Sequence, residues 1–431
     1  MLSNVTSFGL TGIDGFSVQI ETDMVGGVPN FDMVGLGDTA VKESKERVKS
    51  AIRNSGLEFP VKHYTINLAP ADIKKEGPMY DLGIAIGILS ASEQIKHKKY
   101  KNFVYIGELS LDGTVQKVKG VLPILISARN MGYKNVVIPK ANEEEARYIE
   151  GLNIYAVKNL RECVEFLNDE TNTYLLPIET RSFDEAKKEN VMTLDFENVK
   201  GQAQAKRALE IAAAGGHNVL MIGPPGSGKS MLAKCFPSIL PNLTFEEALE
   251  VTKVHSIAGT LDLSKGIITT RPFRTPHHTA TVISLTGGGQ NAKPGEISLA
   301  HNGVLYLDEF PEYNRNLIET LRQPLEDGYI TVARNKQTVT YPASFTLIAS
   351  MNPCPCGNYG SKGKECKCSP VQIHKYLSKI SGPVMDRIDI HVEVDNISFD
   401  DLNSEYKEES SAKIKERVDK AREIQLERFK N

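Results

Sequence analysis

The chain has 431 residues, of which 40% are hydrophobic, and its formal net charge is −3. That length predicts two or three domains with buried cores, and a total charge so close to zero does not by itself indicate a nucleic-acid-binding protein. No apolar run of about 18 residues occurs, and residues 1–6 lack the basic and then apolar pattern of a secretory signal. We therefore expect a cytoplasmic protein without a membrane span.

Periodicity along the chain predicts two domains joined by a polar linker. Residues 1–175 mix short strands with helices, residues 176–193 are polar and charged, and residues 194–398 alternate strands and helices as parallel-sheet nucleotide-binding domains do. Residues 399–431 become acidic and then predict a charged helix at 412–430. Within the first domain we expect strands at 64–68, 103–106 and 135–138 and helices at 39–54 and 81–90. The fold class that follows is α/β.

A phosphate-binding loop is the most informative motif of the chain. Residues 223–230 match the pattern G-x-x-x-x-G-K-[ST] at every fixed position, between a strand expected at 218–222 and a helix expected at 231–236. In that setting backbone N–H groups surround a phosphate chain, Lys229 reaches the β- and γ-phosphates of ATP, and Ser230 binds Mg²⁺. The expected nucleotide-binding residues are Gly223, Pro224, Pro225, Gly226, Ser227, Gly228, Lys229 and Ser230.

Two further expected strands end in polar side chains suited to ATP hydrolysis. Asp308 and Glu309 follow the apolar run 304–307, at the carboxyl end of a strand, where open α/β sheets bind ligands. We expect Asp308 to hold Mg²⁺ and Glu309 to polarise the water that attacks the γ-phosphate. Asn352 ends the strand expected at 345–352 and is placed to hydrogen-bond the γ-phosphate or that water.

Arg387 lies between Asp386 and Asp389. A local salt bridge fits this setting, and so does an arginine finger that enters the ATP site of a neighbouring subunit. Such a finger stabilises the charge that develops on the transferred phosphoryl group. The residues alone favour neither interpretation.

Four of the six cysteines fall in one short window that directly follows Asn352. They are Cys354, Cys356, Cys366 and Cys368. Four thiolates this close suit a tetrahedral Zn²⁺, although the C-x-C spacing is tighter than the common C-x₂-C pair. Two redox-sensitive pairs, or reduced cysteines that only pack, are the alternatives. Cys163 and Cys235 stand in apolar helical surroundings and are expected in the core.

Positive charge is segregated within the second domain. No acid lies between Asp262 and Glu296, and Glu365 is the only acid in the sequence from 328 to 385. This distribution favours a surface that faces a polyanion such as DNA, and a β-hairpin is expected at 329–342. The DNA-binding candidates are Arg271, Arg274, His277, Arg334 and Lys336. A solvated hairpin and loop is the alternative. On the helix at 39–54, a solvated face is favoured over DNA contact for Lys42, Lys45, Arg47 and Lys49.

The ordered motifs GPPGSGKS (223–230), VLYLDEF (304–310), IASMNPCPCG (348–357) and SGPVMDRIDI (381–390) resemble those of the YifB/ComM family of magnesium-chelatase-like AAA+ ATPases. The resemblance covers nearly the whole chain. It implies that Asn352 is the sensor-1 residue, that Arg387 is an arginine finger and that the chain forms a hexameric ring. It also implies a sequence-tolerant motor on branched or single-stranded DNA, such as a branch-migration helicase in recombination or natural transformation. The hairpin at 329–342 and the segment 271–289 would then line the pore.

Residues 68–90 and 106–132 resemble the proteolytic domain of Lon but lack its catalytic groups. Met79 stands at the position of the serine nucleophile and Leu122 at that of the lysine. Since a thioether cannot replace a hydroxyl nucleophile, no peptidase activity is expected. Family members continue into a helical lid with a sensor-2 arginine, of which residues 399–431 hold at most the beginning. We therefore expect the chain to bind nucleotide better than it turns it over.

Two other functions fit the same motifs. A magnesium-chelatase-type subunit would use ATP to remodel a protein partner, but such subunits usually lack the Lon-like domain and the cysteine cluster. A DNA-binding scaffold would bind without turnover.

Overall fold

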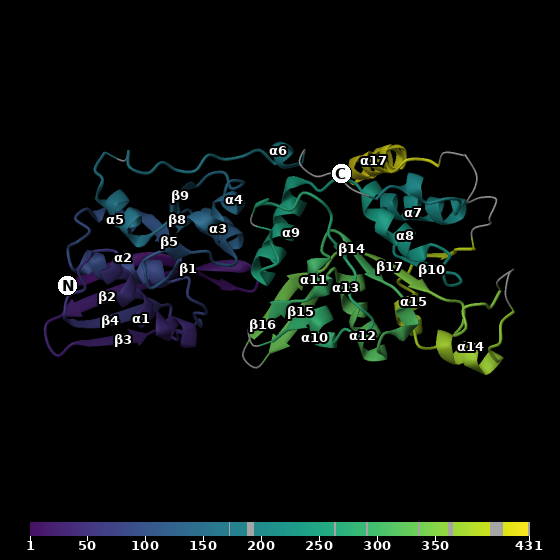
Figure 1. Cartoon of the computed structure of the whole chain (residues 1–431), viewed down its shortest axis with the longest axis horizontal. Coiled ribbons are helices and arrows are strands. Elements are labelled where there is room, and N and C mark those ends of the chain that lie inside the picture. Colours follow the sequence, from purple (N-terminus) through teal and green to yellow (C-terminus); the bar gives the residue numbers. More distant parts are fainter. Residues whose placement is uncertain are drawn as a thin grey trace. The chain divides into compact units, whose positions relative to one another are not determined.

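The structure is a computed structural model that describes residues 1–171, 173–187, 194–262, 264–289, 292–334, 337–360, 365–396 and 408–429. The chain divides into two compact units (Figure 1), one of residues 1–188 and 255–268 and the other of residues 189–254 and 269–431. The mixed α/β fold with a parallel sheet that the sequence predicts is confirmed. The segment 255–268 belongs to the first unit although it lies inside the range expected for the nucleotide-binding domain. The exact domain boundaries stay predictions.

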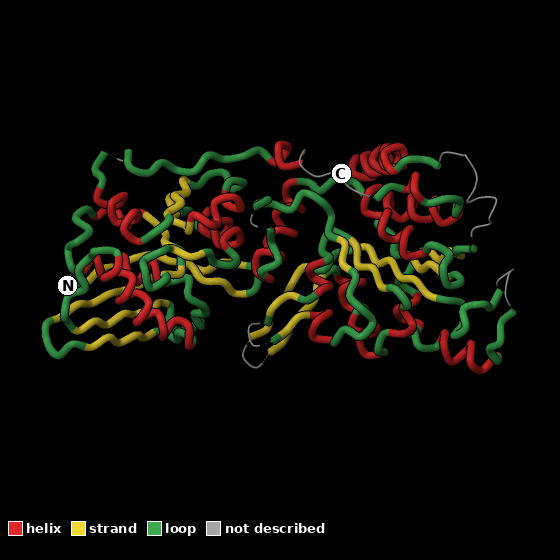
Figure 2. Tube along the Cα trace, in the orientation of Figure 1, coloured by secondary structure: helices red, strands yellow, loops and turns green. Residues whose placement is uncertain are grey.

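The first unit is built on a seven-stranded mixed sheet (Figure 2). The strand order is β3 (Asn30–Val34), β4 (His63–Ala69), β2 (Asp14–Val25), β1 (Leu2–Thr11), β5 (Phe103–Tyr105), β8 (Asn135–Pro139) and β9 (Asn153–Val157). Strand β2 pairs antiparallel with β1 and with β4. Strand β3 pairs parallel with β4, and β5, β8 and β9 extend the sheet from β1 in parallel pairs. The three strands expected from the sequence are β4, β5 and β8.

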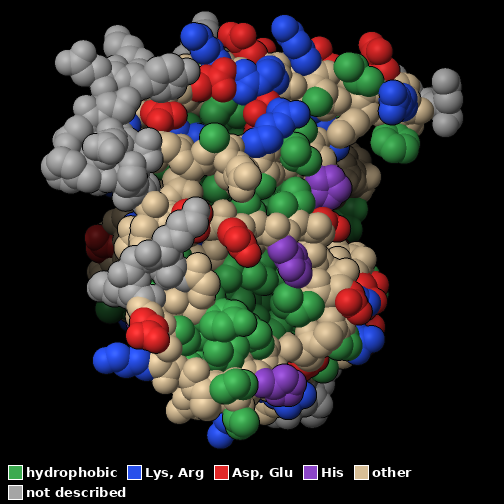
Figure 3. Space-filling model, turned by 90° about the vertical axis from the view of Figure 1, so that its right-hand side faces the viewer, with side chains coloured by type: hydrophobic (Ala, Val, Ile, Leu, Met, Phe, Trp, Pro, Cys, Tyr) green, Lys and Arg blue, Asp and Glu red, His purple; other side chains and the backbone are tan. Residues whose placement is uncertain are grey.

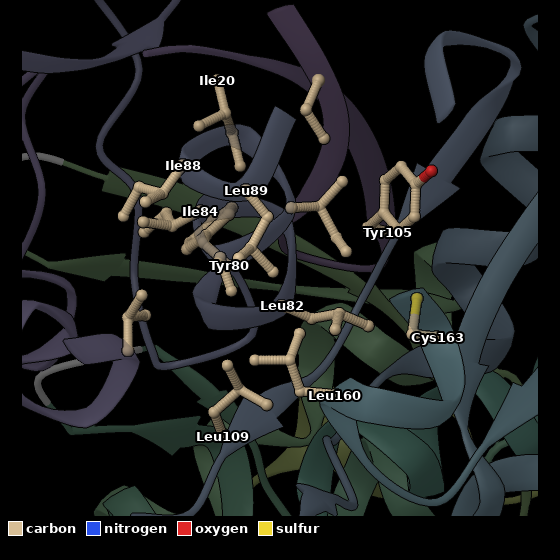
Figure 4. Close-up of a cluster of buried hydrophobic side chains, with 14 of the residues drawn as sticks. Ile20, Tyr80, Leu82, Ile84, Ile88, Leu89, Tyr105, Leu109, Leu160 and Cys163 are labelled. Carbon is tan, nitrogen blue, oxygen red and sulfur yellow. The ribbon is translucent and has the colours of Figure 1, made fainter. Parts of the chain in front are cut away.

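An apolar helix anchors the core of this unit. Ten of the residues of α2 (Asp81–Ala91) are buried, because Leu, Ile, Gly and Ala occupy nearly all of its positions. Figure 4 shows its Ile84 and Leu89 on the side of Ile20 and its Leu82 beside Leu160, with Cys163 in the same cluster, as expected for a core cysteine. The other elements of the unit are α1 (Thr39–Asn54), β6 (Glu108–Leu109), β7 (Val115–Gln116), α3 (Val121–Asn130), α4 (Glu143–Ala146), α5 (Leu160–Asn168) and α6 (Phe183–Lys187).

A buried ion pair joins α1 to α2. The carboxylate of Asp81, which is fully buried, accepts hydrogen bonds from Ser44 Oγ, from Arg47 Nε at 2.7 Å and from the Leu109 N–H at 3.2 Å. Burial raises the pKa of Asp81, and the bonds donated by Arg47 and Ser44 oppose that rise. Arg47 is therefore paired with a buried carboxylate and does not contribute to a cationic face of α1.

The second unit contains a five-stranded sheet in which every neighbouring pair is parallel. The strand order is β11 (Phe273–Arg274), β14 (Val304–Leu307), β17 (Thr346–Met351), β10 (Val219–Ile222) and β18 (Ile390–Glu393). Two antiparallel hairpins accompany it, β12 (Gly287–Gly288) with β13 (Lys293–Pro294) and β15 (Tyr329–Arg334) with β16 (Gln337–Pro342). The hairpin expected at 329–342 is thus confirmed, and so are the strands expected around 218–222, 304–307 and 345–352.

The helices of the second unit flank this sheet (Figure 1). They are α7 (Ala203–Gly215), α8 (Lys229–Cys235), α10 (Val282–Thr286), α11 (Glu296–Leu299), α12 (Arg315–Thr320), α13 (Arg322–Asp327), α14 (Pro370–Leu377), α15 (Gly382–Met385) and α17 (Ser411–Arg428), with α9 (Phe245–Ala258) shared between the units. Helix α17 buries Ile414 and Val418 in the core, and its Arg417 pairs with Glu210 of α7 at 2.6 Å. Cys235 is buried, as expected. Within the described ranges no helix has the length and apolar character needed to cross a lipid bilayer.

Glu145 gives the first unit a buried acid that titrates near neutrality. Its side chain is 1% exposed and accepts hydrogen bonds from Asn142 Nδ2 at 2.6 Å and from Ser256 Oγ at 3.1 Å. Burial raises its pKa to about 7. Ser256 also accepts a hydrogen bond from the Gly120 N–H at 3.1 Å, which ties the segment 255–268 into this unit.

The contribution of Glu145 to the stability of the protein should therefore fall between pH 4.5 and pH 7. Because the pKa of Glu145 is higher in the folded protein than its ordinary value of 4.5, the folded state holds the proton more tightly than the unfolded chain over this range. The free energy of unfolding then decreases by about 3 kcal/mol as pH rises through it. Urea unfolding at several pH values should show a flatter profile for Glu145→Gln than for the wild type; identical profiles would contradict the assignment.

Candidate functional site

Parallel pairing brings three strand ends to one place. Strand β17 lies between β10 and β14, with Ile222 opposite Met351 and Leu307 opposite Ala349. Since parallel strands end at the same edge of a sheet, the loops that follow them meet there. A cavity of about 380 Å³ lies at this edge. It is lined by Pro225, Gly226, Ser227, Gly228, Lys229, Ser230, Met231, Asp308, Glu309, Met351 and Asn352.

Glycine is required at three positions of the phosphate loop. Gly226 and Gly228 have φ values of +80° and +93°, in the region that side chains disfavour. A Cβ atom at Gly223 would meet the carbonyl oxygen of Val394 on the neighbouring chain segment at 2.1 Å. The loop therefore turns tightly out of β10 and into α8, whose first-turn N–H groups have no partner within the helix. Gly223 and Pro224 do not line the cavity but form this entry turn.

Lys229 is held inside the curve of the loop. Its ammonium group donates to the carbonyl oxygens of Gly223 at 2.7 Å and Pro224 at 2.8 Å. Burial lowers the pKa of Lys229, and the charge of Asp308 opposes that shift. A buried cation beside a cavity is costly unless an anion is near, so this environment favours a phosphate group in the cavity.

Asp308 is the centre of a hydrogen-bond network. Its carboxylate accepts from Ser230 Oγ at 2.8 Å and from Ser350 Oγ, and Tyr306 Oη donates to Ser230 Oγ at 3.2 Å. Burial is the largest influence on the pKa of Asp308 and raises it, but the hydrogen bonds from Ser350, Ser230 and Tyr306 bring it below its ordinary value. The ionised carboxylate and the Ser230 hydroxyl form the hard oxygen set that Mg²⁺ prefers, so these residues fit that ion.

Ser350 and Tyr306 escape sequence reasoning because they lie inside strands. Ser350 is fully buried in β17 and Tyr306 is fully buried in β14. In the sequence each of these hydroxyl-bearing residues stands inside a run of mostly apolar residues. The strand alternation is the signal that could have revealed them: Tyr306 and Asp308 are two residues apart, and so are Ser350 and Asn352, so each pair shares one face of its strand.

Glu309 has a strained backbone. Its φ is +53°, which is uncommon for a residue other than glycine and is characteristic of functional sites. The side chain is 58% exposed, and its Oε2 lies 3.6 Å from His278 Nδ1. His278 lies outside the motifs from which the residues of this site are predicted. Its ring contacts that of His277 at a centroid distance of 4.1 Å.

The four clustered cysteines converge. All four Sγ atoms lie within 4.8 Å of one another, and Cys354, Cys356 and Cys366 are separated by 3.4 to 3.7 Å. Four sulfurs at 2.3 Å from one Zn²⁺ in a tetrahedron are about 3.8 Å apart, so the donor set and its dimensions fit zinc. The N–H groups of Asn358 and Lys367 lower the pKa of Cys356, whereas the neighbouring thiols raise the pKa values of Cys366 and Cys368, so one thiolate is favoured in the cluster without metal.

The cysteine loop also touches the ATP site. A Cβ atom at Gly357 would meet Pro225 Cδ of the phosphate loop at 2.6 Å and lie 3.8 Å from Asn352 Cγ. The phosphate loop, Asn352 and the cysteine cluster are therefore in direct contact.

Arg387 does not line the cavity of its own chain. It forms an ion pair with Glu326 of α13, and its Nη1 donates to the Pro383 carbonyl at 2.7 Å. The structure thus contains the salt bridge that the sequence left as one alternative, but with Glu326 rather than with the adjacent acids. The role of Arg387 in a neighbouring subunit stays a prediction.

Two of the DNA-binding candidates are engaged within the second unit. Arg271 donates to the carbonyl oxygen of Pro241 at 2.6 Å and pairs with Glu247 at 3.1 Å. Arg274 pairs with Glu296 at 2.6 Å. Their DNA contact stays a prediction, and these contacts count against it. His277 is exposed and accessible.

For Arg334 and Lys336, the DNA-binding candidates of the hairpin, the structure gives only the backbone pairing of the two strands. Arg334 is opposite Gln337, so residues 335–336 connect the two strands. The side chain of Arg334 and the whole of Lys336 lie outside the described residues.

Comparison with known proteins identifies the family of the chain. Residues 195–402 match the family model described as magnesium chelatase, subunit ChlI, and residues 20–142 match the model described as subunit ChlI of Mg-chelatase. The chain is 43% identical over 434 residues to competence protein ComM of Haemophilus influenzae, which covers 99% of this chain and 83% of that protein. The protein YifB of Escherichia coli is also 43% identical, over 428 residues with the same coverage.

A shorter match concerns the first unit. Lon protease 2 of Bacillus subtilis is 33% identical over 125 residues, or 29% of this chain and 22% of that protein. At the two positions expected to carry the Lon dyad, Met79 packs against the core and Leu122 is 1% exposed.

Proposed function

The chain belongs to the YifB/ComM family of magnesium-chelatase-like AAA+ proteins, and from that premise we propose that it is an ATP-dependent motor on DNA. We propose that it acts as a branch-migration helicase or translocase in DNA recombination or natural transformation. The observation that carries the proposal is the meeting of Lys229, Ser230 and Asp308 with Glu309 and Asn352 around one cavity. The AAA+ family itself implies an ATPase that uses ATP and Mg²⁺.

In the proposed reaction each side chain has one task. Lys229 binds the β- and γ-phosphates, and Ser230 with Asp308 would hold Mg²⁺, which would supply positive charge to those phosphates. Glu309 accepts or orients the proton of the attacking water, and Asn352 donates to the γ-phosphate or to that water. His278, 3.6 Å from Glu309, positions the carboxylate.

We propose that the site is completed by a second copy of the chain, in a hexameric ring. Arg387 lies outside the cavity of its own chain, which supports a role in the site of a neighbour. Figure 3 shows hydrophobic side chains gathered in a hollow in the lower half of one face, with most charged groups above. The second unit also exposes large apolar side chains, among them Val371 at 77% and Met231 at 41%. Exposed apolar surface of this kind fits an assembly interface.

DNA is the proposed substrate because of the hairpin β15–β16 and the name of one relative. Arg334 is the last residue of β15, and the sequence has Lys336 between the two strands. Cations between two hairpin strands can follow backbone phosphates without reading sequence. The relative in Haemophilus influenzae is named a competence protein. The matches to magnesium-chelatase subunit models favour one second candidate, an ATPase that remodels a protein partner.

We also propose Zn²⁺ as a structural cofactor of the cysteine cluster. The fit of the four sulfurs to a tetrahedron supports it, and the contact between Gly357 and Pro225 connects the metal to the phosphate loop. A bound ion would fix Asn352 and the loop in the arrangement that binds nucleotide.

An ATPase assay with and without forked DNA tests the central proposal. We expect DNA to stimulate turnover, and Glu309→Gln to retain nucleotide binding while losing at least a hundredfold in turnover, as expected when the group that activates the water is removed. Binding is measured with a fluorescent nucleotide analogue. Turnover that ignores DNA but depends on an added protein partner would favour the chelatase-type alternative, and unchanged turnover in Glu309→Gln would remove Glu309 from the mechanism.

Arg387→Ala should lower turnover about a thousandfold, because an arginine finger contributes about 10³ or more to the rate. Glu326→Gln is the matched control, since it removes the same ion pair and keeps Arg387. We expect less than a fivefold effect from the control. Equal losses in the two variants would show that the arginine only stabilises α13.

The same variant shows whether the arginine acts between subunits. A mixture of Arg387→Ala and Glu309→Gln chains, each inactive alone, should recover turnover, because interfaces form that contain Glu309 from one chain and Arg387 from the other. No recovery under conditions where mixed oligomers are demonstrated would contradict a shared site.

The purified chain should contain one zinc ion, and Cys356→Ser, which removes one of the four proposed ligands, should lose it and bind nucleotide more weakly. Metal content is measured by mass spectrometry and affinity by fluorescence titration. Cys163→Ser, at a buried cysteine of the first unit, should retain the zinc. Four cysteines that react freely with a thiol reagent in the untreated protein would exclude the metal.

A further inference from the structure

A second cavity lies in the first unit, between α1 and the edge of the sheet formed by β3. Its volume is about 200 Å³. It is lined by Pro29, Asn30, Phe31, Lys45, Lys49, Arg53, Phe59, Pro60, Val61, Lys62 and Tyr64. No acidic residue lines it.

The cavity has an aromatic wall. The Phe59 and Tyr64 rings are 5.0 Å apart between centroids, and the Phe31 and Tyr64 rings 5.9 Å. Phe59 is only partly buried, so it offers ring surface to an occupant. Two cations lie over these rings: Lys45 Nζ is 5.8 Å from the centroid of Phe31 and Arg53 Cζ is 5.8 Å from that of Phe59.

The cations form a row. Lys45, Lys49 and Arg53 are four residues apart along α1, so they share one face of the helix at steps of about 6 Å. Lys62 faces the same cavity from the segment before β4. Among the described residues none of these four forms an ion pair, in contrast to Arg47 of the same helix, which is neutralised by Asp81.

Two acids lie near this cavity without lining it: Asp32 of β3, and Glu58, whose charge adds to the rise in the pKa of Tyr64 that burial causes. Asp32 of β3 lies 3.4 Å from His63 Nε2 and accepts hydrogen bonds from Asn30 at 3.0 Å. Since no described carboxylate forms an ion pair with Lys45, Lys49 or Arg53, these cations repel one another unless an anion lies along them. A linear polyanion matches a row about 12 Å long better than one compact phosphate does.

We propose that this cavity binds single-stranded nucleic acid, with one base against the ring of Phe59 and the flanking phosphates along Lys45, Lys49 and Arg53. Aromatic rings beside a row of cations match the alternation of bases and phosphates, and an acidic peptide has no flat rings to use the aromatic wall. The choice of a nucleic acid rests on the proposed DNA motor, but the site needs no nucleotide or ATPase activity. It would give the chain a contact with nucleic acid in its first unit.

The test uses the full chain without ATP and a fluorescent thymidine oligonucleotide, followed by anisotropy at several salt concentrations. The triple substitution Lys45→Gln, Lys49→Gln and Arg53→Gln should weaken binding at least tenfold. It should also reduce the slope of log affinity against log salt by about 2, since each single-strand phosphate contact contributes about 0.7. The matched control is Lys98→Gln, Lys101→Gln and Lys134→Gln, three exposed lysines of the same unit. Equal binding and slope for the two triple variants would overturn the proposal.

Local contact is tested by photo-cross-linking with an iodouracil oligonucleotide. Cross-linked peptides should include Phe59 or Phe31, and Phe59→Leu, which keeps the apolar volume, should weaken binding about fivefold by removing a stacking surface. Cross-links found only in the second unit would overturn the site, and so would competition by polyglutamate as strong as that by the oligonucleotide, which would indicate an acidic protein partner. DNA-stimulated ATPase activity that persists in the triple variant leaves the motor proposal standing while this site is judged on binding alone.

Discussion

The ATP site depends on one constraint, the insertion of β17 between β10 and β14. In the parallel register Ile222 faces Met351 and Leu307 faces Ala349, so the three loops that carry the chemistry begin within one strand width of each other. The phosphate loop can leave β10 at this point only because Gly223 has no side chain to meet the Val394 carbonyl. Asn352 then follows between the loop and Asp308, which is where a group that senses the γ-phosphate must be. A one-residue slip of β17 would turn Ser350 and Asn352 to the opposite face.

Asp308 shows how the surroundings prepare a metal ligand. Burial alone would favour its neutral form, but hydroxyl groups from three elements donate toward it and keep the carboxylate ionised. Ser230 belongs to α8, Tyr306 to β14 and Ser350 to β17, so the network also fixes the spacing of these elements. Strain is concentrated one residue later, at Glu309, whose positive φ turns its side chain out of the network and toward solvent. Adjacent carboxylates are thus given different roles by their environments.

Sequence reasoning predicts those parts that depend on local spacing. The phosphate loop, the acidic pair after β14, Asn352, the hairpin and the helices expected at 39–54, 81–90, 231–236 and 412–430 follow from short patterns, and the structure has these elements within a few residues of the expected positions. Ser350, His278 and Glu326 were missed because each reaches its partner only through tertiary contact. The charge argument, which stays a prediction, is likewise limited by contacts that the sequence does not show. The window 263–295 holds no acid, yet Glu247 and Glu296, which lie outside it, neutralise Arg271 and Arg274 in space. On α1, the helix expected to be merely solvated, a row of unpaired cations remains.

The partner of Arg387 suggests how hydrolysis could move DNA in the proposed motor. Glu326 lies near the end of α13, and β15 of the hairpin begins only three residues later, at Tyr329. If Arg387 acts in a neighbouring subunit as proposed, its departure from Glu326 would release the helix that leads directly into the β15–β16 hairpin. Its return after phosphate release restores the contact. The energy needed is modest, because Arg387 is 23% and Glu326 44% exposed, and an ion pair so accessible to water contributes little. One arginine can in this way connect the nucleotide state of one subunit to the hairpin position of the next.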